Sequence, residues 1–105
     1  MTSKIKKLKR NPRIVRESLG VFIKKMRLQR GYSQAELATN LGYMSPQFIS
    51  DWERGISSPP VKKLTELADL LDVKVDIIFE LLVTLATEQL VENLSNEFKL
   101  AKKSS

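Results

Sequence analysis

The residues best placed to do chemistry lie in the stretch YMSPQFISDWERG, residues 43–55. Its apolar residues Ile49 and Trp52 are three positions apart, so they would share one side of a short helix. The other sides of that helix would show amide, hydroxyl, carboxylate and guanidinium groups to solvent. These groups donate and accept hydrogen bonds, and packing against the protein core does not explain why they are there.

The composition argues against catalysis. The 105 residues include no His and no Cys, which removes the commonest general base, the commonest zinc ligand and any disulfide. The carboxylates are scattered, and no nucleophile–base pair, phosphate-cradling glycine loop or metal-ligand spacing is present. We therefore expect a protein that is not an enzyme and that uses no cofactor and no metal.

Charge is divided unevenly along the chain. Residues 1–63 hold 14 Lys and Arg against 4 Asp and Glu, for a net charge of +10. Residues 64–105 hold 4 against 8, for a net charge of −4. The basic part would attract a polyanion, and nucleic acid is the usual one. The alternative is a lysine-rich surface that is merely solvated.

No segment indicates a membrane or a secretory route. Apolar runs stay well short of the roughly 18 residues that a membrane-spanning helix needs. The basic residues at the N-terminus are not followed by an apolar segment, as a secretory signal would require. We therefore expect a cytoplasmic protein with one domain, or one domain and an extension.

The apolar periodicity predicts an all-α fold. Spacings of three and four residues predict helices over 16–30, 33–41, 46–54 and 61–72, and a longer one from residue 75. In the first helix Arg27 is expected to face solvent, and in the fourth Val61 is expected to face the core. No Gly or Pro interrupts residues 75–103, so the last helix either runs on for about 44 Å or breaks near Thr87.

Capping residues support these boundaries. Ser33 and Glu36 have the spacing of a capping box, in which each side chain accepts from the other residue's backbone N–H. Ser45 can cap the third helix, with Pro46 at its first position. A glycine ends each of the first three helices: Gly31 as a left-handed cap, then Gly42 and Gly55.

Two helices joined by a tight turn that contains Gly form a helix-turn-helix unit. The segments SQAELATNLG, FISDWERG and SSPPVKKLTELADLLDV together resemble the Cro/XRE-type, phage-repressor-like DNA-binding domains over about residues 16–82. The resemblance is carried by Gln34, Glu36, Leu37, Ala38, Gly42, Ile49, Trp52, Glu53 and Gly55. It supports a five-helix repressor-like domain at 16–82, with a basic flexible arm at 1–15 and a C-terminal helical extension at 83–105.

The resemblance implies that the helix near residues 46–54 enters the DNA major groove. The residues expected to contact bases are Ser45, Gln47, Phe48, Ser50 and Asp51. The residues expected to contact phosphates are Ser33, Gln34, Arg54, Ser57, Ser58 and Lys62. The residues of the arm that are expected along the backbone or in the minor groove are Lys6, Lys7, Lys9, Arg10 and Arg13.

Several of these assignments have a structural alternative. Gln34 can be an ordinary polar residue of a first helical turn. Phe48 can pack against the first helix or the arm, and Asp51 can pair with a nearby Lys. The arm can be a disordered tail that only aids solubility. Glu53 is assigned to an ion pair and Trp52 to the core.

The turn before this helix departs from the family pattern. Six residues, YMSPQF, separate Gly42 from Ile49, one more than is usual in the family. The family's contacts therefore map onto residues 45–47 only to within about one position.

The C-terminal extension carries a long apolar stripe with an acidic outer face. Such a stripe can build a two-fold helical interface, and the alternative is that it only caps the core of one monomer. The residues expected in dimerisation are Leu82, Leu85, Leu90, Val91, Leu94 and Phe98.

These features together predict a sequence-specific regulator of transcription that binds double-stranded DNA as a homodimer at an operator-like site. The alternative is an antitoxin-type regulator whose C-terminal helix binds a partner protein. The two differ in what covers the C-terminal helix.

Overall fold

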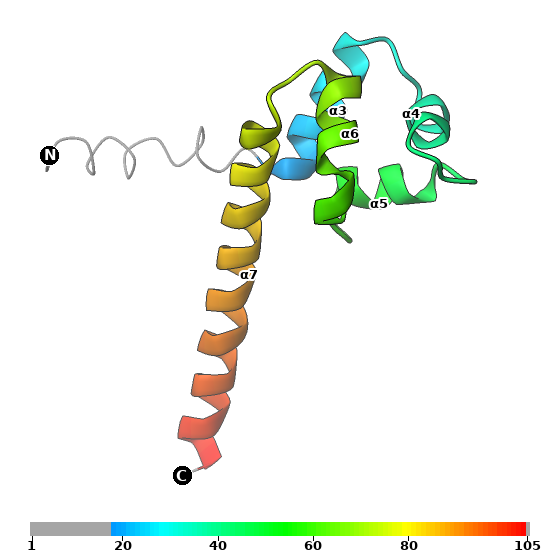
Figure 1. Ribbon diagram of the computed structural model, residues 1–105. Coiled ribbons are helices and arrows are strands. Elements are labelled where there is room, and N and C mark those ends of the chain that lie inside the picture. The colour runs from blue at the N-terminus through cyan, green and yellow to red at the C-terminus, as the bar shows by residue number, and fades with distance from the viewer. Residues whose placement is uncertain (1–17, 105) are drawn as a thin grey trace, which may run out of the picture.

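The structure is a computed structural model that describes residues 18–104. These residues form five α-helices and one 3-10 helix: α3 Leu19–Gln29, α4 Gln34–Asn40, α5 Gln47–Arg54, η1 Val61–Lys63, α6 Leu64–Leu71 and α7 Val75–Ser104 (Figure 1). The all-α class, the helix-turn-helix order and the long C-terminal helix are confirmed. The predicted arm residues Lys6, Lys7, Lys9, Arg10 and Arg13 lie outside the described residues.

One core holds the helices together. Each helix contributes a side chain with no exposed surface: Ile23 from α3, Leu37 from α4, Ile49 from α5, Leu67 from α6 and Ile78 from α7. Helices of seven or eight residues such as α4, α5 and α6 are unstable alone, so this shared packing is what maintains them.

The helices α3 and α5 approach closely at Gly20. A Cβ atom on Gly20 would lie 2.4 Å from the carbonyl oxygen of Trp52 and 2.6 Å from that of Glu53. Only glycine fits there, because real Cβ atoms do not approach a backbone oxygen so closely. The backbone of α3 therefore packs directly on the C-terminal end of α5 and fixes its position.

Two side chains differ from the sequence-based prediction. Arg27 was predicted to be exposed, but it is only 6% exposed because its guanidinium group is paired with Glu53. Val61 was predicted to face the core, but it is 66% exposed. The reason is that residues 61–63 form a 3-10 helix ahead of α6. Its tighter winding changes the direction in which Val61 points.

The last helix, α7, is continuous from Val75 to Ser104, so it does not break near Thr87. Its first part packs against α6 and α3. Residues 86–104 are exposed, and this part of the helix projects away from the other helices (Figure 1). The division between domain and extension at residue 83 falls within this helix and stays a prediction.

Candidate nucleic-acid interface

One side of the helix α5 packs in the core, and the other side faces solvent. Ile49 has no exposed surface and Trp52 is 2% exposed. Gln47 and Arg54 are exposed at the two ends of the helix, and Ser50 between them is half-buried. Gly55, in the left-handed conformation with φ of 76°, ends the helix. The short helix therefore has a fixed inner face and a polar outer face.

The start of α5 lies one residue later than predicted, because Pro46 is the N-cap residue and not the first residue of the helix. The helix begins at Gln47, and Pro46 already has helical angles, with φ of −72° and ψ of −3°. The hydroxyl oxygen of Ser45 accepts from the backbone N–H of Gln47 at 3.0 Å. The Pro46 carbonyl accepts the first helical hydrogen bond, from Ser50 N–H at 3.0 Å. Ser45 thus satisfies a donor that the helix itself cannot satisfy.

Asp51 links the polar side chains of α5. Its Oδ1 atom accepts from Nε2 of Gln47 at 2.7 Å and from Nη2 of Arg54 at 3.0 Å. The partners are four residues before and three residues after, so all three share one side of the helix. Asp51 therefore pairs with Arg54, whereas the structural alternative predicted a pair with a lysine. In the free protein, Asp51 occupies one N–H donor of Gln47 and one of Arg54, and the remaining polar groups of both side chains can still bind another molecule.

Aromatic packing shapes the turn before α5. The ring of Phe48 lies 4.5 Å from the ring of Tyr43, which in turn meets Trp52 edge-on at 5.8 Å. Phe48 nevertheless stays 50% exposed, and Met44 in the same turn is fully exposed. Sequence reasoning missed Met44, although the additional residue in the turn was a sign that a side chain would protrude.

A polar network joins α3, α4 and α5. The guanidinium of Arg27 donates to both oxygens of Glu53, at 2.6 Å and 3.0 Å, and also to the Tyr32 carbonyl at 2.9 Å. The side chains of Arg27 and Glu53 are 7% and 3% exposed. The Gln34 amide donates to Oε1 of Glu53 at 2.9 Å. Glu53 therefore has the structural role predicted, and Gln34 is held at the start of α4 by a buried partner.

The start of α4 is closed by the predicted capping box. Ser33 Oγ accepts from Glu36 N–H at 3.0 Å, and the Glu36 carboxylate accepts from Ser33 N–H at 2.8 Å. The backbone N–H of Ser33, and to a lesser degree its hydroxyl, hold the pKa of Glu36 below its ordinary value of 4.5. Ser33 is exposed next to Gln34, so both predicted phosphate contacts lie at the same helix end.

The loop after α5 contains the remaining predicted phosphate contacts. Ser57 is exposed and its N–H donates to the Asp51 carbonyl at 3.4 Å, whereas Ser58 is half-buried. Lys62 is exposed. Its neighbour Lys63 donates to the Leu41 carbonyl at 2.8 Å and has its ammonium 5.5 Å from the Tyr43 ring. Lys63 thus fastens η1 to the turn between α4 and α5, a role that the sequence did not indicate.

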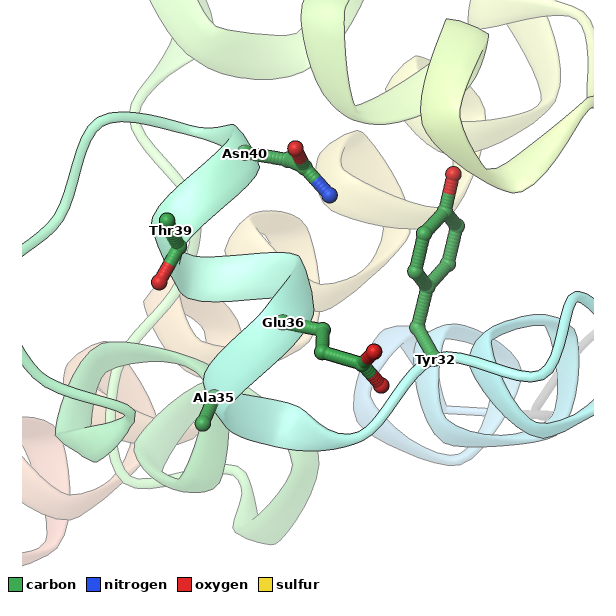
Figure 2. A pocket seen from close by; sticks show the side chains of 5 residues that line it. All are labelled: Tyr32, Ala35, Glu36, Thr39 and Asn40. Atoms are coloured by element: carbon green, nitrogen blue, oxygen red, sulfur yellow. The ribbon is translucent and has the colours of Figure 1, made fainter.

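A hollow of about 320 Å³ lies on the outer face of α4, lined by Tyr32, Ala35, Glu36, Thr39 and Asn40. Figure 2 shows Glu36 and Asn40 extending toward Tyr32, while Ala35 and Thr39 point away from it. The Glu36 carboxylate is already bonded to Ser33 N–H. The hollow contains no nucleophile paired with a base.

Residues 18–104 contain neither a metal-ion site nor a membrane-spanning helix. Within this range no three His, Cys, Asp or Glu side chains gather in a way that could hold a metal ion. In the same range, no helix combines the length and the apolar character needed to cross a membrane.

The arrangement of α4, a turn and α5 can be compared with known families. A helix-turn-helix family model matches residues 23–78, more than half of the chain. This chain belongs to the helix-turn-helix family. The matching type is the Cro/C1 type, so the resemblance drawn from the sequence is confirmed.

A named relative of this helix-turn-helix protein is the SPbeta prophage-derived uncharacterized HTH-type transcriptional regulator YonR of Bacillus subtilis (strain 168). The two are 36% identical over 61 residues, which cover 58% of this chain and 56% of YonR. The chain therefore matches only about half of its relative's length. No solved structure matches the chain significantly.

Proposed function

We propose that this helix-turn-helix protein is a sequence-specific transcriptional regulator that binds double-stranded DNA as a homodimer at an operator-like site. The observation that supports this most is the geometry of α5. Its inner face is fixed by Ile49 and Trp52, while Gln47, Asp51 and Arg54 form a polar row outside. An α-helix fits the major groove, where base edges offer hydrogen-bond donors and acceptors. The name of YonR as a transcriptional regulator supports the same function.

Each outer residue of α5 has a proposed partner on DNA. The Gln47 amide can donate to and accept from adenine, and the Ser50 hydroxyl suits several bases. Phe48 can contact a thymine methyl group with its exposed edge. Asp51 can accept from a cytosine amino group, and it disfavours other bases by its charge. Ser45 stands at the helix start, next to the bases that the first turn would reach.

The phosphate contacts are proposed on both sides of α5. Ser33 and Gln34 lie at the start of α4, where backbone N–H groups and the helix dipole favour a negative charge. Arg54, Ser57, Ser58 and Lys62 would extend these contacts beyond the end of α5. The arm residues Lys6, Lys7, Lys9, Arg10 and Arg13 would follow the backbone or the minor groove.

Homodimerisation is proposed because one recognition helix reads few base pairs. Two copies would place their helices about 34 Å apart, one turn of DNA. The exposed apolar residues Leu90, Val91, Leu94 and Phe98 on α7 support such pairing. They equally favour the second candidate, an antitoxin-type regulator whose α7 is covered by a partner protein. Light scattering of the purified protein separates the two, because a concentration-dependent dimer without any partner favours the homodimer.

Selection of bound sequences from a random DNA pool tests the proposed function. We expect a two-fold symmetric consensus with half-sites about one helical turn apart. Gln47→Ala should then relax the preference at one position of each half-site by about 1–3 kcal/mol. The control is Gln89→Ala, an exposed glutamine on α7, which should leave the consensus unchanged.

Two results would count against this assignment. Equal weakening by Gln47→Ala on every sequence would make Gln47 a backbone contact. A pool that yields no consensus would refute sequence-specific binding altogether.

A further inference from the structure

Two different sides of α7 are apolar, and the first of them belongs to the domain core. It consists of the fully buried Ile78 and the partly buried Leu81, Leu82 and Leu85. At 3.6 residues per turn this side continues through Gln89, Glu92 and Asn96, which are polar. The core side therefore ends near residue 85. The predicted dimerisation residues Leu82 and Leu85 belong to it.

The second apolar side, here called the outer stripe, lies about 150° around the helix from the core side. It consists of Phe79, Val83, Leu90, Leu94 and Phe98, which are 48%, 45%, 57%, 55% and 64% exposed. The outer stripe begins at Phe79, in the part of α7 that packs on the domain, and continues to Phe98 in the exposed part of the helix. Thr87 and Glu97 are polar residues within the same sector of the helix, and between them the apolar members offer a surface for a second helix.

The charges of α7 favour one orientation for that second helix. Residues 75–97 contain Asp76 and four Glu without any Lys or Arg, whereas residues 98–104 contain three Lys. Two parallel copies would bring like charges together at both ends. Two antiparallel copies would bring the basic end of each helix beside the acidic part of the other. In an antiparallel pair, the basic residues 98–104 of one copy would therefore complement the acidic residues 75–97 of the other.

The spacing of the outer stripe fits the same orientation. Phe79 and Ala101 each lie eleven residues from Leu90, and Ala86 and Leu94 each lie four residues from it. In an antiparallel pair centred on Leu90, Phe79 would meet Ala101 and Leu94 would meet Ala86 of the other copy. Of the remaining stripe residues, Val83 would meet Glu97, and Phe98 would meet Leu82. Glu80 would be level with Leu100 of the other copy, and Lys102, two residues further on, lies on the same edge of the stripe, so the two charges would come close to each other.

We infer that a second copy of this chain packs its α7 antiparallel on the outer stripe, with Leu90 at the two-fold axis. The inference rests on the homodimer of the proposed function and names its surface and orientation. Residues 79–101 form the contact, about 33 Å long. The two helix-turn-helix domains sit at opposite ends of the helix pair.

Crosslinking of single-cysteine variants tests the orientation, because the chain has no Cys of its own. A mixture of Ala101→Cys and Phe79→Cys proteins should give a crosslinked dimer with a short bis-maleimide reagent. Ala101→Cys alone should give none, since its two copies would be about 33 Å apart. Leu90→Cys alone should crosslink, and Glu92→Cys, on the polar side of α7, is the matched control that should not.

A charge exchange provides an independent test in variants that keep the outer stripe intact. Glu80→Lys should weaken self-association several-fold in sedimentation equilibrium, because it places two Lys opposite each other. Adding Lys102→Glu to the same chain should restore it. In a parallel dimer the second change would restore nothing, because residue 80 would face residue 80.

The possible outcomes separate the inference from the proposed function. Crosslinking of Ala101→Cys to itself would show a parallel pair, which overturns the inference and leaves the homodimer standing. A monomer at every concentration would overturn both the homodimer and the inference. No DNA is present in these experiments, so a failure of DNA recognition affects neither.

Discussion

At the scale of single residues, Asp51 restrains the two side chains of α5 that are best placed to reach DNA. It accepts from Gln47 and from Arg54, and it would bring a negative charge close to phosphates. Asp51→Asn keeps the size of the side chain and one acceptor oxygen but removes the charge. We expect affinity for a scrambled duplex to rise by up to about fivefold, equivalent to about 1 kcal/mol, with a smaller gain on the selected sequence.

Fluorescence anisotropy titrations with the two duplexes at one salt concentration measure this difference. Asp69→Asn, an exposed change on α6, is the matched control for the lost charge. A loss of affinity on both duplexes with Asp51→Asn would show that the Asp51 network prepares α5 for binding instead of restraining it.

Glu36 makes the stability of the domain depend on pH. Its pKa is held below 4.5 in the folded protein by the N–H and hydroxyl of Ser33, so the folded state binds fewer protons than the unfolded state just below that pH. The stabilisation is complete above 4.5 and is lost as the pH falls through the lower pKa of the folded state. Urea unfolding of the wild type and of Glu36→Gln measures it. We expect their free energies of unfolding to converge as the pH is lowered.

The comparison of the wild type with Glu36→Gln controls for the other titrating groups. All other carboxylates are shared by the two proteins, so their titration cancels in the difference. A difference that stays constant from neutral pH to well below 4.5 would show that the Glu36 charge contributes nothing to the capping box.

Residue-scale prediction from sequence succeeded where the partners are close in the chain. Ser33 and Glu36 are three residues apart, and the capping box was recognisable from that spacing alone. Arg27 failed for the opposite reason. Its partner Glu53 is 26 residues away, and periodicity assigns a charged residue to solvent unless the distant partner is known.

At the scale of elements, the contact between α3 and α5 depends on Gly20. A Cβ atom there would lie 2.4 Å from the Trp52 carbonyl oxygen, which cannot move without displacing α5. Gly20→Ala should therefore lower the free energy of unfolding by about 1–3 kcal/mol through overpacking, measured by urea unfolding. By helix propensity alone the same change would stabilise α3 by about 1 kcal/mol.

Overpacking and helix propensity thus predict opposite signs for the change in the free energy of unfolding caused by Gly20→Ala. Gly31→Ala serves as the comparison, because its Cβ would meet nothing within 4 Å and only its φ of +78° is unfavourable. We also expect Gly20→Ala to weaken DNA binding more than Gly31→Ala does when both variants are folded to the same extent. The reason is that Gly20→Ala displaces α5. A stabilised Gly20→Ala protein would contradict the close packing of the two helices.

Element-scale prediction gave the helices and their order, because each has a periodic apolar side and the first three end at a glycine. It could not separate the two apolar sides of α7. Apolar residues at three- and four-residue spacing occur all along this helix, so one list mixed Leu82 and Leu85 with Leu90 and Phe98. Only the packing of α6 and α3 on the first part shows which side is already covered.

At the scale of the whole molecule, the two charge-bearing parts of the chain have separate tasks under the proposed function. The basic part, residues 1–63, includes α4 and α5, but these two helices hold three carboxylates and one Arg, so its positive charge lies outside them. The acidic part contains α7. In Figure 1, α4 and α7 lie on opposite sides of the helix cluster. A second copy on α7 would therefore leave the outer face of α4 free, and the acidic segment would be kept away from phosphates.

The salt dependence of DNA affinity reports how many phosphates the whole protein–DNA complex neutralises. Each phosphate that a Lys or Arg neutralises contributes about 0.9 to the slope of log affinity against log salt concentration. If Lys62 contacts a phosphate in both copies of a dimer, Lys62→Ala should reduce the slope by about 1.8, and a bound monomer would lose about 0.9. Titrations of the selected duplex at several salt concentrations give the slopes, with Lys74→Ala, an exposed change before α7, as the control that changes nothing. An unchanged slope for Lys62→Ala would remove Lys62 from the interface, and a binding affinity independent of salt would remove phosphate contacts altogether.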